Sequence, residues 1–317
     1  MNRTLLAGSL STLTLALTIS ICSPAPAQQA AAQGKLDGIL KKGDDLYKAG
    51  KFKEAIDSYK EALVVDPEND QAVGYIAYSY NKLHDAEQAR VWMKRRLEIP
   101  GQSPSKKAQV LTDLTLLYWD EAHMEIATRL AVGSKNVKPE EAGVTKKFLA
   151  EGINCAQKAV VIAPRSIKGF NLLNLLYRAS AATEPDQATR AELLAKADEA
   201  LRKSVEIFES APQPQSNDLW MVPTLSAING TELGQSIHFG SATKKASAEA
   251  FKDAKGGGAV VEVVVGRDGK VRLPRVLAGQ GKLGDAAVGA ARQWEFEPTT
   301  FEGHTVQVIE TISFPLK

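Results

Sequence analysis

The chain is poor in the side chains that build most catalytic and metal sites. Its 317 residues include only 2 cysteines and 4 histidines. Cys22 lies in the N-terminal apolar region, so a chain without that region keeps Cys155 alone and forms no intrachain disulfide. Cys155 stands beside Ala156 in a helical stretch, a setting typical of a small packed residue rather than a reactive thiol.

The chemistry-bearing motifs of common enzymes are also missing. His123 follows Asp120 by three places, so the two can share a helix face, but no second histidine or cysteine joins them at metal-ligand spacing. This pattern favours a charged outer helix face over a metal site. No G-x-S-x-G occurs, and the glycines at 256–258 follow no strand, so they do not form a phosphate-binding loop. We therefore expect no enzymatic activity, no cofactor and no metal.

An excess of charge of either sign is absent as well. Lysine and arginine number 39 and aspartate and glutamate 37, a net charge of +2. Such a balance gives no electrostatic reason to bind nucleic acid or an anionic membrane. The one short basic run, at 94–96, is typical of a solvated helix face.

Long apolar runs are limited to residues 5–21, which carry no charge and follow Arg3. Ala25 and Ala27 then form a small-residue cleavage site, so we interpret residues 1–27 as a secretory signal peptide and 28–34 as a short tether. Two alternatives stay open. An uncut segment would be a membrane anchor, and lipidation of Cys22 would need a small residue where Ile21 stands.

What the chain does contain is a helical repeat. In residues 35–67, small or apolar side chains recur every three or four positions in two halves, which predicts two helices separated by a turn at Gly50. Gly43 and Ala55 would let the helices approach, Tyr59 would fill the space beside them, and Pro67 would end the second helix. This stretch resembles a tetratricopeptide (TPR) repeat, a helical hairpin of about 34 residues.

Further hairpins follow in the same frame. Residues 70–100 repeat the pattern with His84 at the turn, residues 105–164 form a third hairpin with an enlarged turn, and residues 166–209 form a fourth with an insertion. We expect a helical solenoid over 35–210, since one hairpin cannot bury its own face. Tyr78 and Trp92 fall outside the core frame. They would either line a concave face that binds peptides or pack between neighbouring repeats.

The character of the chain changes after Pro212 and Pro214. We interpret residues 211–258 as a linker with short strands at 220–225 and 235–239, followed by a short helix at 241–255. Residues 259–317 then predict the order strand, strand, helix, strand, with Pro274 confining the second strand to a sheet edge or a bulge.

This C-terminal stretch resembles the C-terminal domain of the TonB family. The resemblance is carried by GRDGKV at 266–271, the alanine-rich helix at 283–291, RQWEFEP at 292–298 and GHTVQV at 303–308. It implies a small α+β domain of the cell envelope that contacts partner proteins by pairing a sheet edge with an extended segment, and in some members contacts the cell wall. The expected edge is residues 306–313, with Val306, Val308, Glu310 and Ser313 as candidate contacts.

These patterns predict an exported, non-enzymatic adaptor of the periplasm or cell envelope. Its partners would be proteins or peptide segments, with peptidoglycan or an outer-membrane transporter as further possibilities, and no nucleic acid. The alternative is a TonB-type energy transducer anchored by an uncut N-terminal helix. The Pro-rich span that such transducers use is reduced here to residues 212–214, and a helical stack stands in its place.

Overall fold

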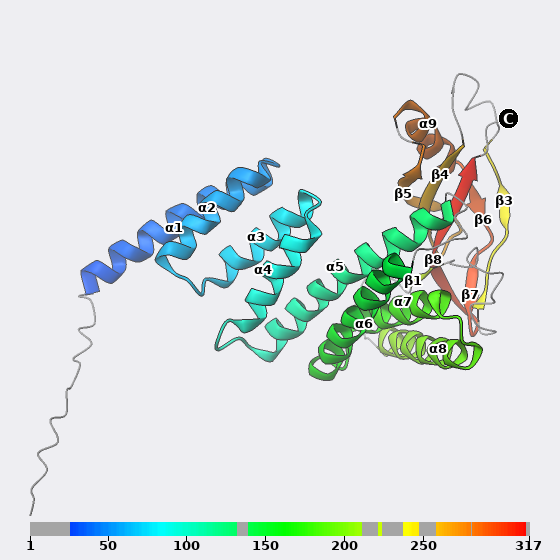
Figure 1. Cartoon of the computed structure of the whole chain (residues 1–317), viewed down its shortest axis with the longest axis horizontal. Helices are drawn as coiled ribbons and strands as arrows, with labels where there is room; N and C mark the ends of the chain where they lie inside the picture. The colour runs from blue at the N-terminus through cyan, green and yellow to red at the C-terminus, as the bar shows by residue number, and fades with distance from the viewer. Residues whose placement is uncertain are drawn as a thin grey trace, which may run out of the picture.

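The computed structural model describes residues 26–131, 139–210, 221–223, 237–246, 258–279 and 281–314. Eight helices of the described part form four antiparallel hairpins, which stack side by side from the N-terminus toward a small sheet domain (Figure 1). They are α1 (Pro26–Lys48), α2 (Phe52–Val65), α3 (Asp70–Lys82), α4 (Ala86–Glu98), α5 (Pro104–Ala131), α6 (Pro139–Ile162), α7 (Ile167–Thr183) and α8 (Gln187–Glu209).

The first hairpin closes as the small and aromatic residues predict. Ala55 and Tyr59 are fully buried, and the Tyr59 ring lies directly on Gly43. A methyl group at Gly43 would stand 2.7 Å from that ring, so α1 and α2 can approach this closely only because residue 43 lacks a side chain. The Tyr59 hydroxyl donates to Asp44 Oδ1 at 2.6 Å, which satisfies the buried phenol.

Side-chain caps set the start of several helices. Asn69, Asp85, Ser166 and Asp186 precede α3, α4, α7 and α8, and each accepts a hydrogen bond from a backbone N–H in the first turn. Those N–H groups have no partner inside a helix, so each cap stabilises its helix by about 1 kcal/mol. These polar residues, together with the prolines that follow α2 and α6, divide the chain into hairpins.

Two boundaries differ from the sequence expectation. Residues 28–34, expected to form a tether, belong to α1, because Ala30, Ala31 and Ala32 have the highest intrinsic preference for helix. The sixth helix begins at Pro139, six residues before the start at Thr145 that the sequence pattern predicts, since proline is well suited to the first helical position. The expected signal peptide up to residue 25 lies outside the described residues.

The C-terminal region forms the predicted strand, strand, helix, strand core with additional short strands. Its elements are β1 (Met221–Pro223), β2 (Ile237–His238), β3 (Ala242–Lys244), β4 (Ala259–Val265), β5 (Val271–Ala278), α9 (Lys282–Ala291), β6 (Glu295–Phe296), β7 (Thr299–Phe301) and β8 (His304–Phe314). The strand order is β2-β7-β8-β4-β5, and β1 pairs with β8 in parallel. The strands β3 and β6 form a separate antiparallel pair.

The strand β5 is both an edge and bulged, as Pro274 predicts. It stands at one end of the strand order and pairs with β4 alone among the described strands. Leu273 and Pro274 together oppose one residue of β4, since Arg272 pairs with Val264 and Arg275 pairs with Glu262. A proline has no N–H to donate to a ladder, so the chain tolerates it where the pairing is already interrupted.

The helix expected over residues 241–255 is corrected at its start. Residues 242–244 form strand β3, and Lys244 and Ser241 contact Glu295 and Glu297. Pairing with a strand distant in the sequence outweighs the local helical preference here. Residues 247–257 lie outside the described part of the chain.

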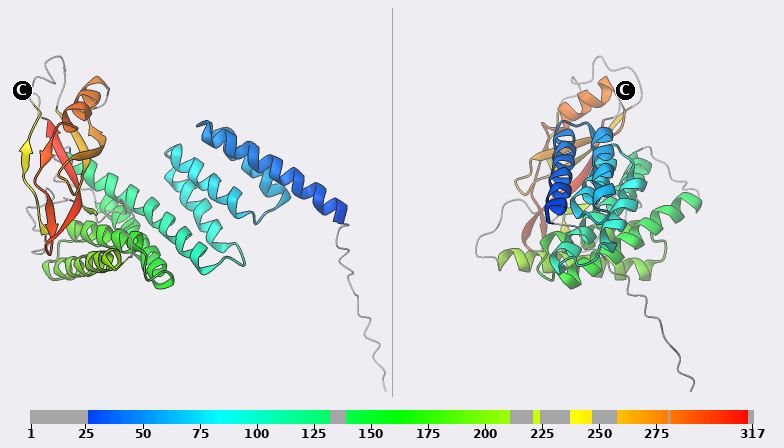
Figure 2. Two further views of the ribbon diagram at one scale, coloured as in Figure 1. Left: turned by 180° about the vertical axis from the view of Figure 1, so that it is seen from behind. Right: turned by 90° about the vertical axis from the view of Figure 1, so that its left-hand side faces the viewer.

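The sheet domain is packed against the helical stack rather than tethered to it. Alternate residues of β4 face opposite ways. Val261 and Val263 pack with α9, whereas Val260 packs with Ala127 of α5. Ile309 of β8 joins the core formed by α5 to α8. Figure 2 shows the sheet at the end of the stack that is distant from α1. The two parts therefore share a core and hold one orientation.

The turns of the first two hairpins provide a test of this geometry. Gly50 and His84 both take the left-handed conformation, with φ of 74° and 60°. A residue with a Cβ is strained there by about 1 kcal/mol, so we expect Gly50→Ala to destabilise the chain by that amount. His84→Gly should instead stabilise it by about 0.5 kcal/mol, because released strain exceeds the added entropy of the unfolded chain. Urea unfolding of both variants measures the two signs, and equal signs would contradict the account.

Candidate protein-binding surfaces

The first helices of the hairpins present a continuous row of polar and aromatic side chains. Tyr47 of α1 meets Tyr75 of α3 edge to face with ring centroids 5.1 Å apart, and Tyr75 meets Tyr78 at 5.9 Å. Tyr78 then reaches α5 through Asp113, which lies 3.9 Å from Lys168 of α7. We call this row the tyrosine face. The three tyrosines are half-buried, so part of each ring edge is open to a partner.

Tyr78 is held in place by charged neighbours. Its hydroxyl donates to Asp113 Oδ2 at 2.7 Å and accepts from Arg96 Nη1 at 3.2 Å. Burial and the hydrogen bond to Asp113 raise the pKa of Tyr78 to about 12, so the phenol stays neutral at physiological pH. Arg96 is buried in turn, and its Nε and Nη2 donate to the Asp70 carboxylate at 2.8 Å each. Tyr78 is therefore positioned by two neighbouring helices, α4 through Arg96 and α5 through Asp113.

Trp92, the other aromatic residue predicted to bind a partner, lies on α4 rather than on the tyrosine face. It is half-buried and packs against the hydrophobic cores between neighbouring hairpins, and the guanidinium of Arg95 lies 4.9 Å from its ring centroid. Tyr78 packs against one of these cores as well. Both residues thus contact the cores between repeats, and a partner-binding role for either one stays a prediction.

The predicted edge strand occupies an interior place in the sheet. On the side opposite β4, β7 and then β1 pair with residues 304–309 of β8, whereas β4 pairs with residues 308–314. Val306 pairs with Thr299 of β7, Val308 pairs with Val265 of β4, and both valines are buried. The expectation of an open edge is therefore wrong for this half, because the segment before the domain returns as β1 and pairs with β8.

The other two predicted contacts lie farther along β8. Glu310 pairs with Val263 and is half-buried, and Ser313 pairs with Val260 and is exposed. Of the four predicted sheet residues, Ser313 alone has an exposed side chain. The sequence predicts a strand at 220–225 but not its partner, since the residues of β1 lie more than 80 positions before those with which they pair.

The junction between the helices and the sheet contains a buried pair, His123 and Glu262. The sequence pattern predicts an exposed helix face at His123 instead. His123 of α5 is 3% exposed and pairs through Nε2 with Glu262 Oε2 of β4. Arg275 of β5 contacts the other oxygen of the same carboxylate, and the Trp119 ring stacks on the imidazole at 4.6 Å. The expected charged outer face at His123 is thus wrong, because the sheet covers this side of α5.

Comparisons with known proteins identify both parts. A family model described as TPR repeat matches residues 43–84, and one described as Gram-negative bacterial TonB protein C-terminal matches residues 247–316. The chain contains a TPR repeat and a TonB C-terminal domain. Both domain types are protein-interaction modules, and the TonB C-terminal domain is typical of the bacterial cell envelope. The second match begins 12 residues before the boundary expected at 259.

Solved structures and curated proteins add little to this identification. One similar structure is that of Pseudomonas aeruginosa pilF, which is 15% identical over 56% of this chain and 85% of its own. Another is YrrB, described as a TPR protein with an unusual peptide-binding site, which is 14% identical over 57% of this chain and 97% of its own. MamA protein is 18% identical over 56% and 98%. All three have a TM-score of 0.26. No curated protein matches the chain.

Metal-ligand clusters and membrane-spanning helices are both absent from the described residues. Within them, no group of three or more histidine, cysteine, aspartate or glutamate side chains is arranged to hold a metal ion. No helix among them has both the length and the apolar character needed to cross a bilayer. The apolar run at 5–21 lies outside this part of the chain.

The charged junction ties the TonB C-terminal domain to the repeats in a pH-dependent way. Burial alone would raise the pKa of Glu262, but His123 and Arg275 outweigh it, so the pKa lies below the ordinary value of 4.5. A carboxyl group with a depressed pKa stabilises the fold fully above its ordinary pKa, and this stabilisation is lost as pH falls through the lower, folded-state value.

We expect Glu262→Gln to destabilise the chain by about 3 kcal/mol at pH 7, because it removes the carboxylate that pairs with the buried His123 and with Arg275. The difference from the unsubstituted chain should shrink as pH falls below 4.5 and through the lower pKa of the folded state, where the carboxylate is itself protonated. Urea unfolding between pH 3 and pH 7 measures both effects. Glu302→Gln is the matched control, since it removes an exposed pair with Arg202 between the same two domains and should cost under about 1 kcal/mol.

Proposed function

We propose that this chain is an exported, non-enzymatic adaptor that binds two protein partners in the bacterial periplasm or cell envelope. The observation that carries the proposal is the shared core between the repeats and the TonB C-terminal domain. Two interaction modules locked together present their partners at a fixed distance and angle. A flexible linker would not do so.

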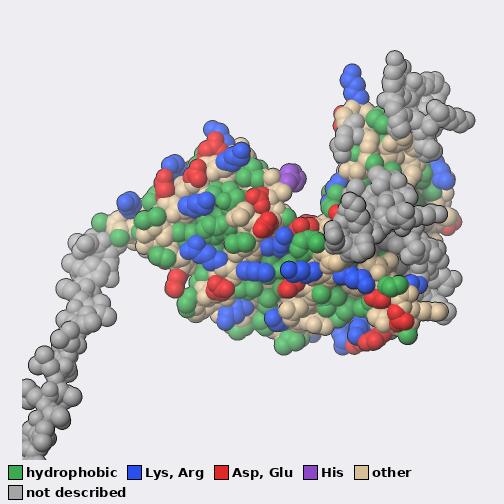
Figure 3. All heavy atoms as spheres, viewed as in Figure 1, with side chains coloured by type: hydrophobic (Ala, Val, Ile, Leu, Met, Phe, Trp, Pro, Cys, Tyr) green, Lys and Arg blue, Asp and Glu red, His purple; other side chains and the backbone are tan. Residues whose placement is uncertain are grey.

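The tyrosine face is the surface that we assign to a peptide segment. Half-buried tyrosines offer large, rigid contact area together with a hydroxyl group, and ordering them on binding costs little entropy. Charged residues at both ends of the row, Asp44 and Lys168, would orient a bound segment electrostatically. Figure 3 shows a hollow between the first hairpins and the sheet domain, which leaves room for such a partner.

The TonB C-terminal domain is the second surface. An extended segment of a partner would add to a sheet edge through backbone hydrogen bonds. Because β1 and β7 accompany the first half of β8, such a segment would meet the strand beyond Ile309, where the exposed Ser313 lies. A protein, or peptidoglycan, would be the ligand there.

We also propose that the chain has no catalytic activity. His123, Glu262 and Arg275 form an internal network whose role is adequately explained by docking. The second candidate function is a TonB-type energy transducer with an uncut anchor. The match to the TonB C-terminal domain favours it, whereas the rigid attachment of that domain to the repeats favours the adaptor.

The mature N-terminus separates these two functions. We expect the chain, expressed with its own leader in a Gram-negative host, to have an intact mass that starts at Gln28 and to appear in the soluble periplasmic fraction. A membrane-bound product that retains residues 1–21 would instead support the transducer. A lipid-modified start at Cys22 would mean a tethered lipoprotein and would contradict the assigned cleavage site.

Site-specific photo-crosslinking tests the tyrosine face. Gln71 and Lys82 are exposed and follow the same side of α3 as Tyr75 and Tyr78, at helical spacing. We expect a photoreactive residue at either position to capture a partner protein in the periplasm of the producing cells. Lys53, exposed on α2, is the control and should capture none of it. Equal capture from all three positions would contradict the assigned surface.

A further inference from the structure

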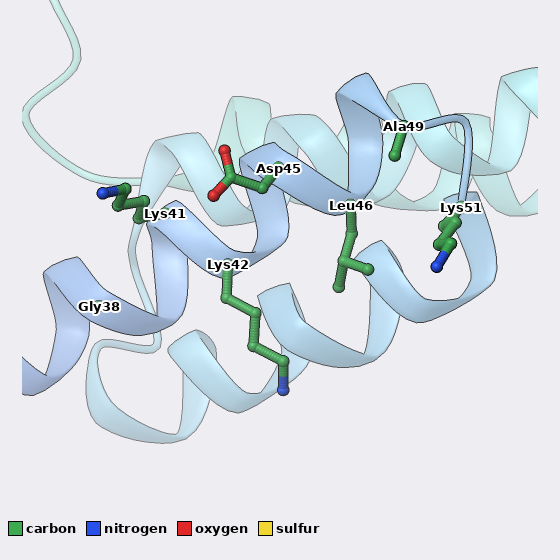
Figure 4. A pocket seen from close by; sticks show the side chains of 7 residues that line it. All are labelled: Gly38, Lys41, Lys42, Asp45, Leu46, Ala49 and Lys51. Atoms are coloured by element: carbon green, nitrogen blue, oxygen red, sulfur yellow. The ribbon is translucent and has the colours of Figure 1, made fainter.

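The outer face of α1 carries a groove at the free end of the stack. It has a volume of about 440 Å³ and lies along α1 and the turn into α2 (Figure 4). Its lining residues are Gly38, Lys41, Lys42, Asp45, Leu46, Ala49 and Lys51. Figure 4 shows Lys42 and Leu46 pointing to one side of α1, with Lys41 and Asp45 directed differently.

The repeat register shows what kind of element this groove accepts. Gly38, Lys42 and Asp45 stand 34 positions before Ala72, Ile76 and Ser79 of α3, which are all completely buried. Ala72 and Ile76 belong to the core in which Ala62 and Leu63 of α2 also take part. The equivalent face of α3 is thus covered by the second helix of the preceding hairpin. On α1 the same face is open.

The charge of the groove indicates which helix would fit. Three lysines and one aspartate line it, and a lysine replaces the buried Ile76 of the next repeat. Lys42 already lies 4.0 Å from Glu61 of α2. A helix that covered Lys41 and Lys51 without supplying carboxylates would leave those two amines desolvated without a partner of opposite charge, which is costly. A second copy of the same face would bring the lysines of both chains together. An acidic helix avoids both costs.

We propose that this groove receives an acidic amphipathic helix of a partner protein, laid on α1 as α2 lies on α3. The apolar strip of that helix covers Gly38, Leu46 and Ala49, and its carboxylates pair with Lys41, Lys42 and Lys51. Because Gly38 has no atom within 4 Å of where a Cβ would stand, the incoming helix can approach the backbone there. This surface is separate from the tyrosine face and from the sheet, so it can fail while the proposed function stands.

A fluorescent, helix-stapled peptide of 14 residues, the length of α2, is the probe. It carries alanine and leucine on one face and glutamate at the flanking positions, and a second peptide has glutamine at those positions. We expect fluorescence anisotropy to detect binding of the glutamate peptide to the mature chain and much weaker binding of the glutamine peptide. Equal binding of the two, or binding of neither, would overturn the proposal.

Charge reversal in the groove locates the site. Lys41→Glu with Lys42→Glu should weaken binding of the glutamate peptide at least about tenfold, since two exposed ion pairs together are worth about 1.4 kcal/mol. The matched control, Lys53→Glu with Lys147→Glu, makes the same charge change at exposed positions of α2 and α6 and should leave the Kd within about twofold. Unchanged binding by the groove variant would overturn the proposal.

Self-association is the remaining alternative occupant, and sedimentation equilibrium measures it. We expect the mature chain to stay monomeric at concentrations where the glutamate peptide binds. A dimer that disappears in the Lys41→Glu, Lys42→Glu variant would assign the groove to a second copy of the chain and overturn the acidic-partner proposal. Because these lysines are exposed, circular dichroism should show the same helix content in all variants.

Discussion

The fold depends on burying both faces of one β-sheet. The strand β4 is buried along almost its entire length, and its residues alternate between α9 and the repeat helices. The helix α9 has 10 residues and covers only one of the two faces. An apolar second face left in water would cost about 25 cal/mol for each Å² exposed. The helices α5, α7 and α8 remove that cost by packing against it.

This packing also explains the unusual burial of α7. Residues 171–179 of that helix are all buried, because α6, α8 and the sheet enclose it together. Its polar side chains are satisfied internally. Ser204 donates to Asn171 at 2.8 Å, and Arg178, which has no exposed surface, pairs with Asp198. The enclosed segment of α7, residues 171–179, lies where the repeat array meets the sheet domain.

Packing against the sheet leaves only part of the helical stack accessible to partners. The C-terminal hairpins pack against the sheet, so the surfaces of the stack that can bind a partner are the tyrosine face and the outer face of α1. The outer face of α1 lies at the end of the stack away from the sheet (Figure 1), whereas the tyrosine face runs from Tyr47 of α1 to Lys168 of α7. Partners bound to the repeats and to the sheet would be held by one rigid body, and the distance between them would be set by the length of the stack.

Local pattern determined most of the secondary structure. Gly43 beneath Tyr59, the left-handed turns at Gly50 and His84, and the bulge at Pro274 were all predictable, since each depends on residues close in sequence. Pairings between distant segments were decided only in three dimensions. The strand β1 joins β8, β3 replaces an expected helix, and His123 meets Glu262 across 139 positions. No periodicity encodes such contacts, because their energy exists only when segments distant in the sequence are brought together in the fold.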